Sequence, residues 1–235
     1  MKTTENRRVL VTGASRGLGL EFVRQLLARG DSVIAACRDP ERAQALQALR
    51  TDGRLHLLAL DVTDDAAVSA MADAVRKHFP ALDLLVNNAG VLPSGERFGQ
   101  VRAETLRQAF DTNAVAPLLL AQALAPVLAQ GREATVLNIS TVLASIAGTD
   151  AFRTPSYSIS KAALNMAAVL MSRALAEQRV RVVNLHPGWV RTDKGGKGAT
   201  LDAEDSVRSM LGTLDRLPRS ASGVFLDRDG EPLPW

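Results

Sequence analysis

The amino-acid sequence predicts an α/β protein in which a doubly wound parallel β-sheet of about seven strands carries helices on both faces. Short runs of β-branched and other apolar residues alternate with longer segments whose apolar residues recur at helical spacing. The strand candidates have no polar face, which is typical of strands buried on both sides. The chain has 235 residues, 46% of them hydrophobic, which suits a single domain, 1–235, with a full core.

The first half of the chain shows this alternation clearly. The run RVLVT predicts a strand at 8–12, and a helix is expected at 18–29. The run SVIAA predicts a strand at 32–36, and a helix should follow at 40–50, because Asp39 suits the cap and Pro40 the first turn. The next strand and helix are expected at 55–60 and 64–78.

The second half continues in the same way. Strands are expected at 82–87, 134–139, 180–185 and 223–226, and helices at 103–130, 157–177 and from about residue 202. No internal repeat interrupts the series. Residues 193–201 change in composition to glycine and lysine, which predicts a short flexible loop.

Composition argues against several classes of protein. The net charge is +3, but Lys and Arg are scattered in runs of no more than two and aromatic residues are only 4%, which disfavours nucleic-acid binding. The single cysteine, Cys37, cannot form an internal disulfide and suits a reducing compartment. The start MKTTENRR lacks the apolar segment of a signal peptide, and no apolar run reaches the roughly 18 residues of a membrane span. We therefore expect a cytoplasmic protein without membrane insertion.

A glycine-rich turn joins the first strand to the first helix. Gly13, Gly17 and Gly19 let backbone N–H groups approach a pyrophosphate and let the helix start pack on the strand. A glycine triplet alone is weak evidence, but here it stands in the required strand–turn–helix context. The sequence therefore predicts a Rossmann-type dinucleotide site.

The end of the second strand indicates which dinucleotide binds. An acidic residue there would grip the ribose hydroxyls of NAD, but the position holds Cys37, and Arg38 follows. Arg38 and Arg16 together favour the 2′-phosphate of NADP. Asp39 argues against this, although it suits the helix cap better. The alternative, that both arginines are solvated loop residues, stays open, so NADP(H) is preferred and NAD(H) is possible.

Further motifs follow along the chain. They are, in order, Thr12-Gly13 to Gly19 (TGxxxGxG), Asp61-Val62, Asn87-Asn88-Ala89-Gly90, Asn113, Ser140, Tyr157 with Lys161 (YxxxK), and Pro187-Gly188 with Thr192. In this order they resemble the short-chain dehydrogenase/reductase family, in its compact single-domain form, over essentially the whole chain.

The resemblance implies a set of site residues. The catalytic residues would be Ser140, Tyr157, Lys161 and Asn113. The cofactor-binding residues would be Gly13, Ser15, Arg16, Gly17, Leu18, Gly19, Arg38, Asp61, Val62, Asn87, Ala89, Gly90, Tyr157, Lys161, Pro187, Gly188, Val190 and Thr192. No metal site is expected, because the three histidines have no acidic partners at ligand spacing. His186 is expected to pack behind the nicotinamide-binding segment.

The chemistry of the catalytic set can be argued from the residues. Tyr157 and Lys161 stand four apart on one predicted helix and so share a face. Bringing a phenol from a pKa of about 10 to near 7 needs roughly 4 kcal/mol, which a nearby ammonium and a bound nicotinamide would supply. Ser140, at a strand end, would hydrogen-bond the substrate oxygen. In the family, Asn113 holds a water that links the lysine to solvent, although an asparagine in a long helix also plugs backbone kinks.

Within the family the chain is similar to the carbonyl-reductase branch that includes C-factor and Sniffer-type proteins. This rests on the segments 186–193 and 229–235 and on the short glycine-rich stretch between 193 and 201. Many members carry a long helical flap there, and about nine residues cover a pocket poorly. We expect a shallow, open site for varied aldehydes and ketones, with Leu92, Leu143, Ile146, Phe152 and Trp189 near it.

The predicted function is NADPH-dependent reduction of a small carbonyl compound to an alcohol, or the reverse. One alternative is a cofactor-binding signalling protein of the C-factor type with incidental turnover. An epimerase or dehydratase is disfavoured, because such relatives usually add a substrate domain. The family commonly pairs its two long helices, here 103–130 and 157–177, so a homo-oligomer is expected, with a dimer favoured and a tetramer possible.

Overall fold

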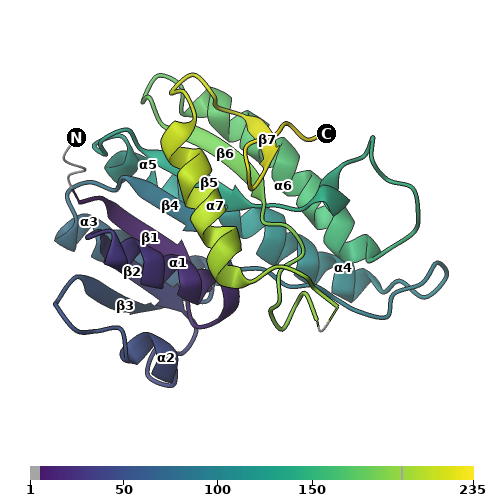
Figure 1. Ribbon diagram of the computed structural model, residues 1–235, viewed down its shortest axis with the longest axis horizontal. Helices are drawn as coiled ribbons and strands as arrows, with labels where there is room; N and C mark the ends of the chain where they lie inside the picture. Colours follow the sequence, from purple (N-terminus) through teal and green to yellow (C-terminus); the bar gives the residue numbers. More distant parts are fainter. Residues whose placement is uncertain (1–5, 197) are drawn as a thin grey trace.

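The computed structural model describes residues 6–196 and 198–235, so Lys197 of the predicted loop lies outside the described residues. The seven expected strands form one sheet in the order β3–β2–β1–β4–β5–β6–β7, and every neighbouring pair is parallel (Figure 1). The strands are β1 (Arg8–Thr12), β2 (Ser32–Cys37), β3 (Leu55–Ala59), β4 (Leu84–Asn87), β5 (Thr135–Ile139), β6 (Arg181–His186) and β7 (Val224–Asp227). The predicted fold class is confirmed.

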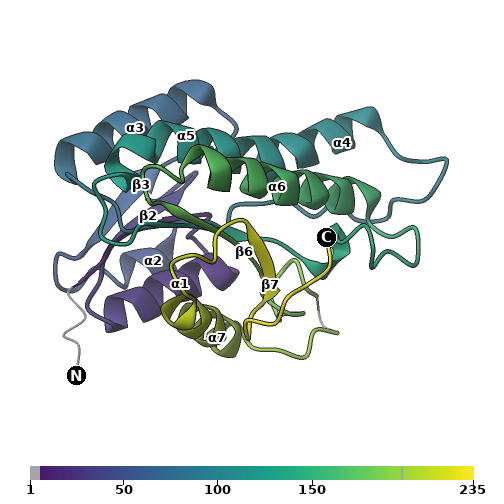
Figure 2. The ribbon, with the colours of Figure 1, turned by 90° about the horizontal axis from the view of Figure 1, so that it is seen from above.

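Helices cover both faces of the sheet, as Figure 2 shows from above. One face carries α1 (Gly17–Ala28) and α7 (Ala203–Arg216), and the other carries α3 (Asp65–His78), α5 (Ala116–Leu128) and α6 (Pro155–Ala174). Each face has its own apolar core of buried strand and helix residues. The chain order of the strands reverses between β1 and β4, which is where ligands bind in open α/β sheets.

The predicted helix at 40–50 is much shorter in the structure. Only α2 (Gln44–Gln47) is helical. The backbone N–H of Arg42 donates to Asp39 Oδ1 over 3.1 Å, so Asp39 caps a turn instead of a helix. Leu46 is the one buried side chain of α2, and Ala43 and Leu49 on either side of it also pack on the core without a longer helix.

The predicted helix at 103–130 is divided by a π-helical turn. It comprises α4 (Ala103–Phe110), the π turn η1 (Asp111–Val115) and α5. The Ala116 N–H bonds to the carbonyl of Asp111, five residues back, so the helix is locally widened. The π turn contains Asn113, which the sequence had marked for either a catalytic role or a backbone kink.

This helical run also bears on membrane insertion. Residues Ala103–Leu128 span 26 residues and are long and apolar enough to cross a bilayer by length and composition alone. More than half of the apolar window is buried inside the protein, where α5 packs on the sheet and against α3 and α6. The same composition is that of a core helix, and the run is weak evidence for a membrane span.

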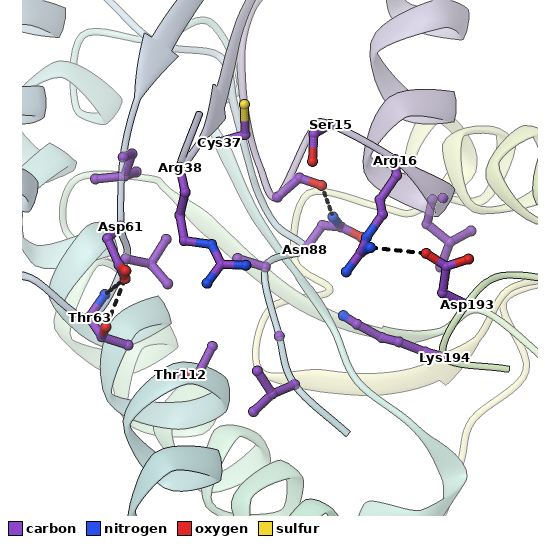
Figure 3. A pocket seen from close by; sticks show the side chains of 18 of the residues that line it. Ser15, Arg16, Cys37, Arg38, Asp61, Thr63, Asn88, Thr112, Asp193 and Lys194 are labelled. Carbon is purple, nitrogen blue, oxygen red and sulfur yellow. Dashed lines mark hydrogen bonds and ion pairs between the residues drawn. The ribbon is translucent and has the colours of Figure 1, made fainter. Parts of the chain in front are cut away.

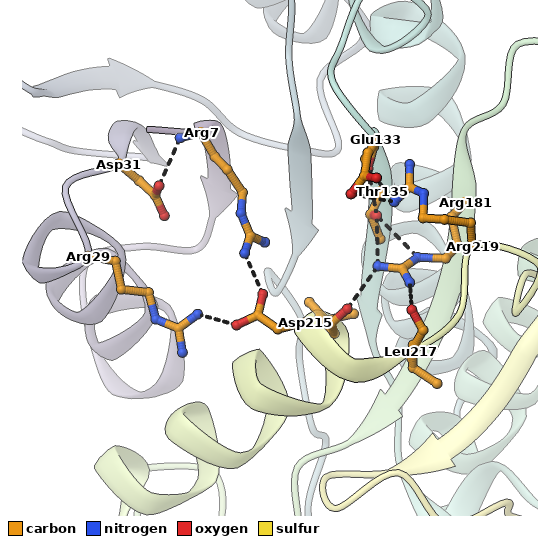
Figure 4. Close-up of polar contacts among 10 residues, drawn as sticks. Arg7, Arg29, Asp31, Glu133, Thr135, Arg181, Asp215, Leu217 and Arg219 are labelled. Atoms are coloured by element: carbon orange, nitrogen blue, oxygen red, sulfur yellow. Dashed lines mark hydrogen bonds and ion pairs between the residues drawn. The ribbon is translucent and has the colours of Figure 1, made fainter. Parts of the chain in front are cut away.

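Ionic contacts join the elements at the amino edge of the sheet (Figure 4). Asp215, at the end of α7, accepts from Arg7 and, over 2.9 Å, from Arg29. Arg181 is buried and donates to the carbonyls of Leu214 and Leu217 at the carboxyl end of α7, where cations are favoured. These bonds hold α7 against β1 and β6.

Asp83 is the buried acceptor that fixes the start of β4. Its carboxylate accepts from the backbone N–H, Nε and Nη2 of Arg8 at 2.8–2.9 Å and from the backbone N–H of Arg132 at 2.6 Å. Burial opposes its charge, but the bonds from Arg8 and Arg132 outweigh burial and lower the pKa of Asp83. The carboxylate therefore joins the ends of β1 and β4.

Asp83→Asn is expected to lower the free energy of unfolding at pH 7 by about 2–4 kcal/mol, because Arg8 loses its buried ionic partner. The pKa of Asp83 is depressed in the folded state, so its contribution is present above about pH 4 and is lost as the pH falls through the folded pKa. The difference between the two proteins should therefore shrink in acid. Urea denaturation at several pH values measures this difference.

The matched control is Asp73→Asn on α3, which removes an exposed ion pair with Arg76. This change should cost less than about 1 kcal/mol, because exposed ion pairs are solvated. Equal losses in the two variants would contradict the structural role of Asp83.

Candidate active site

The turn after β1 forms a tight glycine cradle. Gly13 and Gly17 have φ of +63° and +55°, which favour glycine. A Cβ on Gly19 would lie 2.2 Å from the Gly13 carbonyl oxygen, so no larger residue fits there. The cap residue Arg16 makes no side-chain cap bond and the first turn of α1 has no acidic residue, which leaves its N–H groups available to an anion.

Asn88 holds this cradle to the end of β4. Its Nδ2 donates to the Thr12 carbonyl over 2.9 Å and to the Gly13 carbonyl over 3.1 Å. Thr12 Oγ1 in turn accepts from the backbone N–H groups of Asn88 and Ala89, each over 3.1 Å. The crossing between β1 and β4 is thereby fixed by hydrogen bonds that local sequence patterns did not identify.

A pocket of about 800 Å³ opens at this crossing (Figure 3). The residues expected to bind cofactor that line it are Gly13, Ser15, Arg16, Gly17, Leu18, Arg38, Asp61, Val62, Ala89, Gly90 and Thr192. Cys37 also lines it, and burial raises the pKa of its thiol, which suits a small filler.

Seven other residues expected at the cofactor do not line this pocket: Gly19, Asn87, Tyr157, Lys161, Pro187, Gly188 and Val190. Gly19 lies behind the turn, against Gly13. The side chain of Asn87 is buried, and its Nδ2 donates to Oδ1 of Asn138 on the neighbouring strand β5 over 2.8 Å. Eleven of the residues expected at the cofactor therefore line the pocket, and the catalytic candidates Tyr157 and Lys161 lie outside its lining.

Two arginines flank the pocket. Arg16 pairs with Asp193 over 3.1 Å, and both side chains are exposed. In the part of the chain that the structure describes, Arg38 has no carboxylate within ion-pair distance, and Figure 3 shows its guanidinium pointing into the pocket. Hydrogen bonds from the Thr63 backbone and hydroxyl lower the pKa of Asp61, with a smaller contribution from the charge of Arg38. Arg38 is therefore free to meet an anionic ligand.

Lys194 is a pocket residue that the sequence reasoning missed. Its side chain extends into the pocket (Figure 3), and Nζ lies 3.6 Å from the position a Cβ on Gly90 would take. Loss of solvent and the charge of Arg16 lower the pKa of Lys194 to about 8. The available signal was its place directly after Thr192 and Asp193, in the segment assigned only to a substrate loop.

The catalytic candidates meet where α6 crosses the carboxyl end of β5. Lys161 Nζ donates to the Ile139 carbonyl over 2.7 Å, and Ser140 Oγ donates to Asn165 Oδ1 over 2.7 Å. The side chain of Thr141 lies near enough to Tyr157 to oppose the rise in the pKa of its phenol. Ile139, the last residue of β5, and Ser140, which follows it, are thus each hydrogen-bonded to one residue of α6.

Burial governs the ionisation of the pair on α6. It raises the pKa of Tyr157 to about 12, with the side chain of Thr141 acting in the opposite direction. It lowers the pKa of Lys161 to about 7, helped by the charge of Lys194. We expected a nearby ammonium and a bound nicotinamide to lower the pKa of the Tyr157 phenol. Without nicotinamide the pKa is not lowered, because Lys161 donates to a backbone carbonyl and the tyrosine is desolvated.

Asn113 is completely buried in the π turn. Its Oδ1 accepts from the Val91 N–H over 2.8 Å, and its Nδ2 donates to the Val91 carbonyl and to Ser160 Oγ, each over 2.9 Å. Ser160 Oγ donates to the Tyr157 carbonyl over 2.8 Å. The amide therefore clamps the segment after β4 to α6, and both of its Nδ2 hydrogens are used by protein partners.

The segment after β6 carries the remaining residues expected at the cofactor. Gly188 has φ of +84°, and Ser206 Oγ donates to the Pro187 carbonyl over 2.7 Å. Val190 forms a parallel bridge with Leu201, which closes the base of the loop between them. His186 is largely buried, which lowers its pKa to about 4, so the imidazole is neutral at physiological pH.

Four of the five apolar residues expected near the substrate lie open to solvent. Leu143, Ile146, Phe152 and Trp189 are all exposed, with Ile146 at 79%, whereas Leu92 is half-buried. Phe152 packs edge-on against Phe98 with ring centroids 5.5 Å apart. The shallow substrate site stays a prediction.

Comparison with known proteins now identifies the family. Residues 7–200 match the family described as short chain dehydrogenase. The NADPH-bound carbonyl reductase from chicken fatty liver is 38% identical, with a TM-score of 0.93 over 98% of this chain and 100% of that one. The carbonyl reductase Sniffer of D. melanogaster is 33% identical, with a TM-score of 0.94 over 98% and 100%.

A relative of another kind is the C-signal of Myxococcus xanthus, 42% identical over 154 residues that cover 66% of this chain and 93% of the relative. The motifs, the sheet topology and these matches agree. The chain therefore belongs to the short-chain dehydrogenase/reductase family of oxidoreductases.

Proposed function

We propose that the protein is an NADPH-dependent carbonyl reductase that converts aldehydes or ketones to alcohols, or catalyses the reverse reaction. The observation that carries this proposal is the meeting of Ser140, Tyr157 and Lys161 at the end of β5, beside the glycine-cradled pocket. The NADPH-bound chicken enzyme, a carbonyl reductase of matching fold, supports it.

The pocket fits a dinucleotide phosphate. The glycine turn brings the unpartnered N–H groups of α1 to its floor, and the cations Arg16, Arg38 and Lys194 line it. Arg38, at the end of β2, would bind the 2′-phosphate, and Lys194 beside Gly90 would bind the pyrophosphate. When bound, NADPH supplies the hydride for the reduction.

Tyr157 is the proton donor in this proposal. With a pKa of about 12 it is protonated at neutral pH and holds the proton that the substrate oxygen needs during reduction. Lys161 shares its helix face and can stabilise the phenolate that remains. Ser140 would steady the substrate oxygen by a hydrogen bond. Both Nδ2 hydrogens of Asn113 are used by Val91 and Ser160, so a water that links Lys161 to solvent would have to donate to the second lone pair of Asn113 Oδ1 or bind the backbone of the π turn.

A signalling role is the second candidate, and the similarity to C-signal favours it. The two candidates differ in whether turnover depends on the catalytic set. A regulator with incidental turnover would keep its cellular effect when catalysis is removed, whereas a reductase would not.

Tyr157→Phe is expected to lower kcat/KM for aldehydes and diketones by about 10²–10⁴-fold, because the phenylalanine carries no proton to transfer. Affinity for NADPH should change less than about threefold, since the fold of the pocket is kept. NADPH oxidation against a panel of carbonyl compounds measures turnover, and fluorescence titration measures binding. Ser158→Ala, on the same turn of α6, is the control with turnover like the wild type; unchanged turnover in Tyr157→Phe would refute the reductase assignment.

Arg38→Asp is expected to weaken NADPH binding at least tenfold and to leave NADH binding nearly unchanged, because only NADPH carries the 2′-phosphate. Lys194→Met should weaken both nucleotides by similar factors, since the pyrophosphate is common to them. Dissociation constants from fluorescence titration test both. Lys77→Met, on the exposed face of α3, is the control, and an equal loss of NADPH and NADH affinity in Arg38→Asp would overturn the assignment of Arg38.

We also propose that the chain forms a homodimer through its long helices. The outer faces of α4, α5 and α6 expose Phe110, Leu118, Ile159, Met166 and Leu170. Exposed apolar side chains on neighbouring helices suit a second copy of the same surface.

Met166→Glu is expected to shift the protein from dimer to monomer, because a charge would be buried at the centre of this face. Sedimentation velocity at several concentrations measures the change. Glu177→Gln, beyond the end of α6, serves as the control; a wild-type protein that sediments as a monomer would contradict the proposal.

A further inference from the structure

Four asparagines form a hydrogen-bonded row inside the protein, here called the asparagine row: Asn87 on β4, Asn138 on β5, Asn184 on β6 and Asn165 on α6. Nδ2 of Asn87 donates to Oδ1 of Asn138, Asn138 to Asn184, and Asn184 to Asn165, each over 2.8 Å. The first three are directly paired in the register of neighbouring strands.

The asparagine row is placed where apolar residues would be expected. Its members are at most 3% exposed, and the residues two positions earlier on the same strands, Leu85, Val136 and Val182, belong to the core under α5 and α6. A buried amide costs free energy unless its groups are hydrogen-bonded. The row meets this cost by joining each amide to the next, and only Asn87 Oδ1 and Asn165 Nδ2, at its two ends, lack partners among the described residues.

The direction of the row is set at its β4 end. Asn87 Nδ2 also donates to the Pro117 carbonyl, over 3.4 Å, and a carbonyl can only accept. Each amide then presents its NH₂ to the next oxygen, so Asn165 presents Oδ1 toward the active site. That oxygen accepts two hydrogens, one from Asn184 and one from Ser140 Oγ.

This double acceptance matters for Ser140. A serine hydroxyl has a single proton, and at rest Ser140 directs it to Asn165. To donate a hydrogen bond to a substrate oxygen, the Ser140 hydroxyl must rotate its proton away from Asn165. Because Asn184 still donates to Oδ1, Asn165 is not left as an unsatisfied buried acceptor, which would cost about 1–3 kcal/mol.

We propose that Asn165 is the positioning residue for Ser140, and that the asparagine row allows the Ser140 proton to turn from Asn165 to the substrate oxygen without leaving an unpaired acceptor in the core. The inference rests on the proposed function for its catalytic consequence. The placement of Ser140 by Asn165 rests on the hydrogen bonds alone.

The test uses Asn165→Ala and Asn165→Asp in the full chain. Asn165→Ala should lower kcat about 10–100-fold for the carbonyl compound that the wild type turns over best, with KM and the NADPH dissociation constant within about threefold. Asn165→Asp keeps an acceptor oxygen in a side chain of the same shape, and its kcat should recover to within about fivefold of the wild type. Ser172→Ala, which removes another buried hydroxyl bond on α6, should leave kcat unchanged.

A double-mutant cycle separates positioning from packing. If Asn165 acts through Ser140, Ser140→Ala with Asn165→Ala will have the kcat of Ser140→Ala alone. Additive losses would overturn the proposal, as would an Asn165→Ala protein with wild-type kcat. Should Asn165→Ala fail to fold, Asn165→Leu, which is closer to asparagine in volume, takes its place in the cycle.

Crystal structures of the wild type and Asn165→Ala give a readout that needs no turnover. The Ser140 hydroxyl should leave its position in the variant, and an unchanged Ser140 would refute the placement. Turnover that survives Tyr157→Phe would refute the reductase function, while the crystal structures would still decide the role of Asn165.

Discussion

The packing of α6 across the carboxyl end of β5 is the contact on which the active site depends. Lys161 bonds to the carbonyl of Ile139, and Asn165 bonds to the Ser140 hydroxyl, so two turns of one helix are fixed to adjacent strand-end residues. A helix carries side chains four residues apart on one face, and a strand end presents its groups at a sheet edge. Joined here, the two elements bring candidate catalytic groups from the two ends of the segment 140–154 to one point.

The cofactor end depends on a different contact, the hydrogen bonds that close β1 onto β4. Thr12 and Asn88 bond to each other through side chain and backbone, and Asn88 also holds the Gly13 carbonyl. The glycines can approach a phosphate because the backbone beneath them is held in this way. The two halves of the candidate site are thus built on neighbouring strands of one parallel sheet.

The sequence alone predicted the parts of this molecule that depend on local chemistry. The strand series, the glycine turn and the YxxxK pair each follow from residues close together in the chain, and the structure has them where expected. The π turn at Asn113 and the pocket position of Lys194 depend on contacts between distant segments. Asn165 was missed for the same reason, since its partners Ser140 and Asn184 lie on two different strands. The short α2 reflects a local turn at Asp39, which the helix-cap interpretation did not anticipate.

The bridge between Val190 and Leu201 separates the start of the segment after β6 from the loop that follows it. It closes the loop at its base, and the Trp189 indole steadies the loop by donating to the Gly195 carbonyl over 2.9 Å. Pro187 and Gly188 precede these anchors, and Thr192 and Lys194 lie just inside them, at the pocket. Beyond Lys194, which lines the pocket, the loop can therefore vary in length and sequence among proteins of this architecture while the pocket lining stays the same.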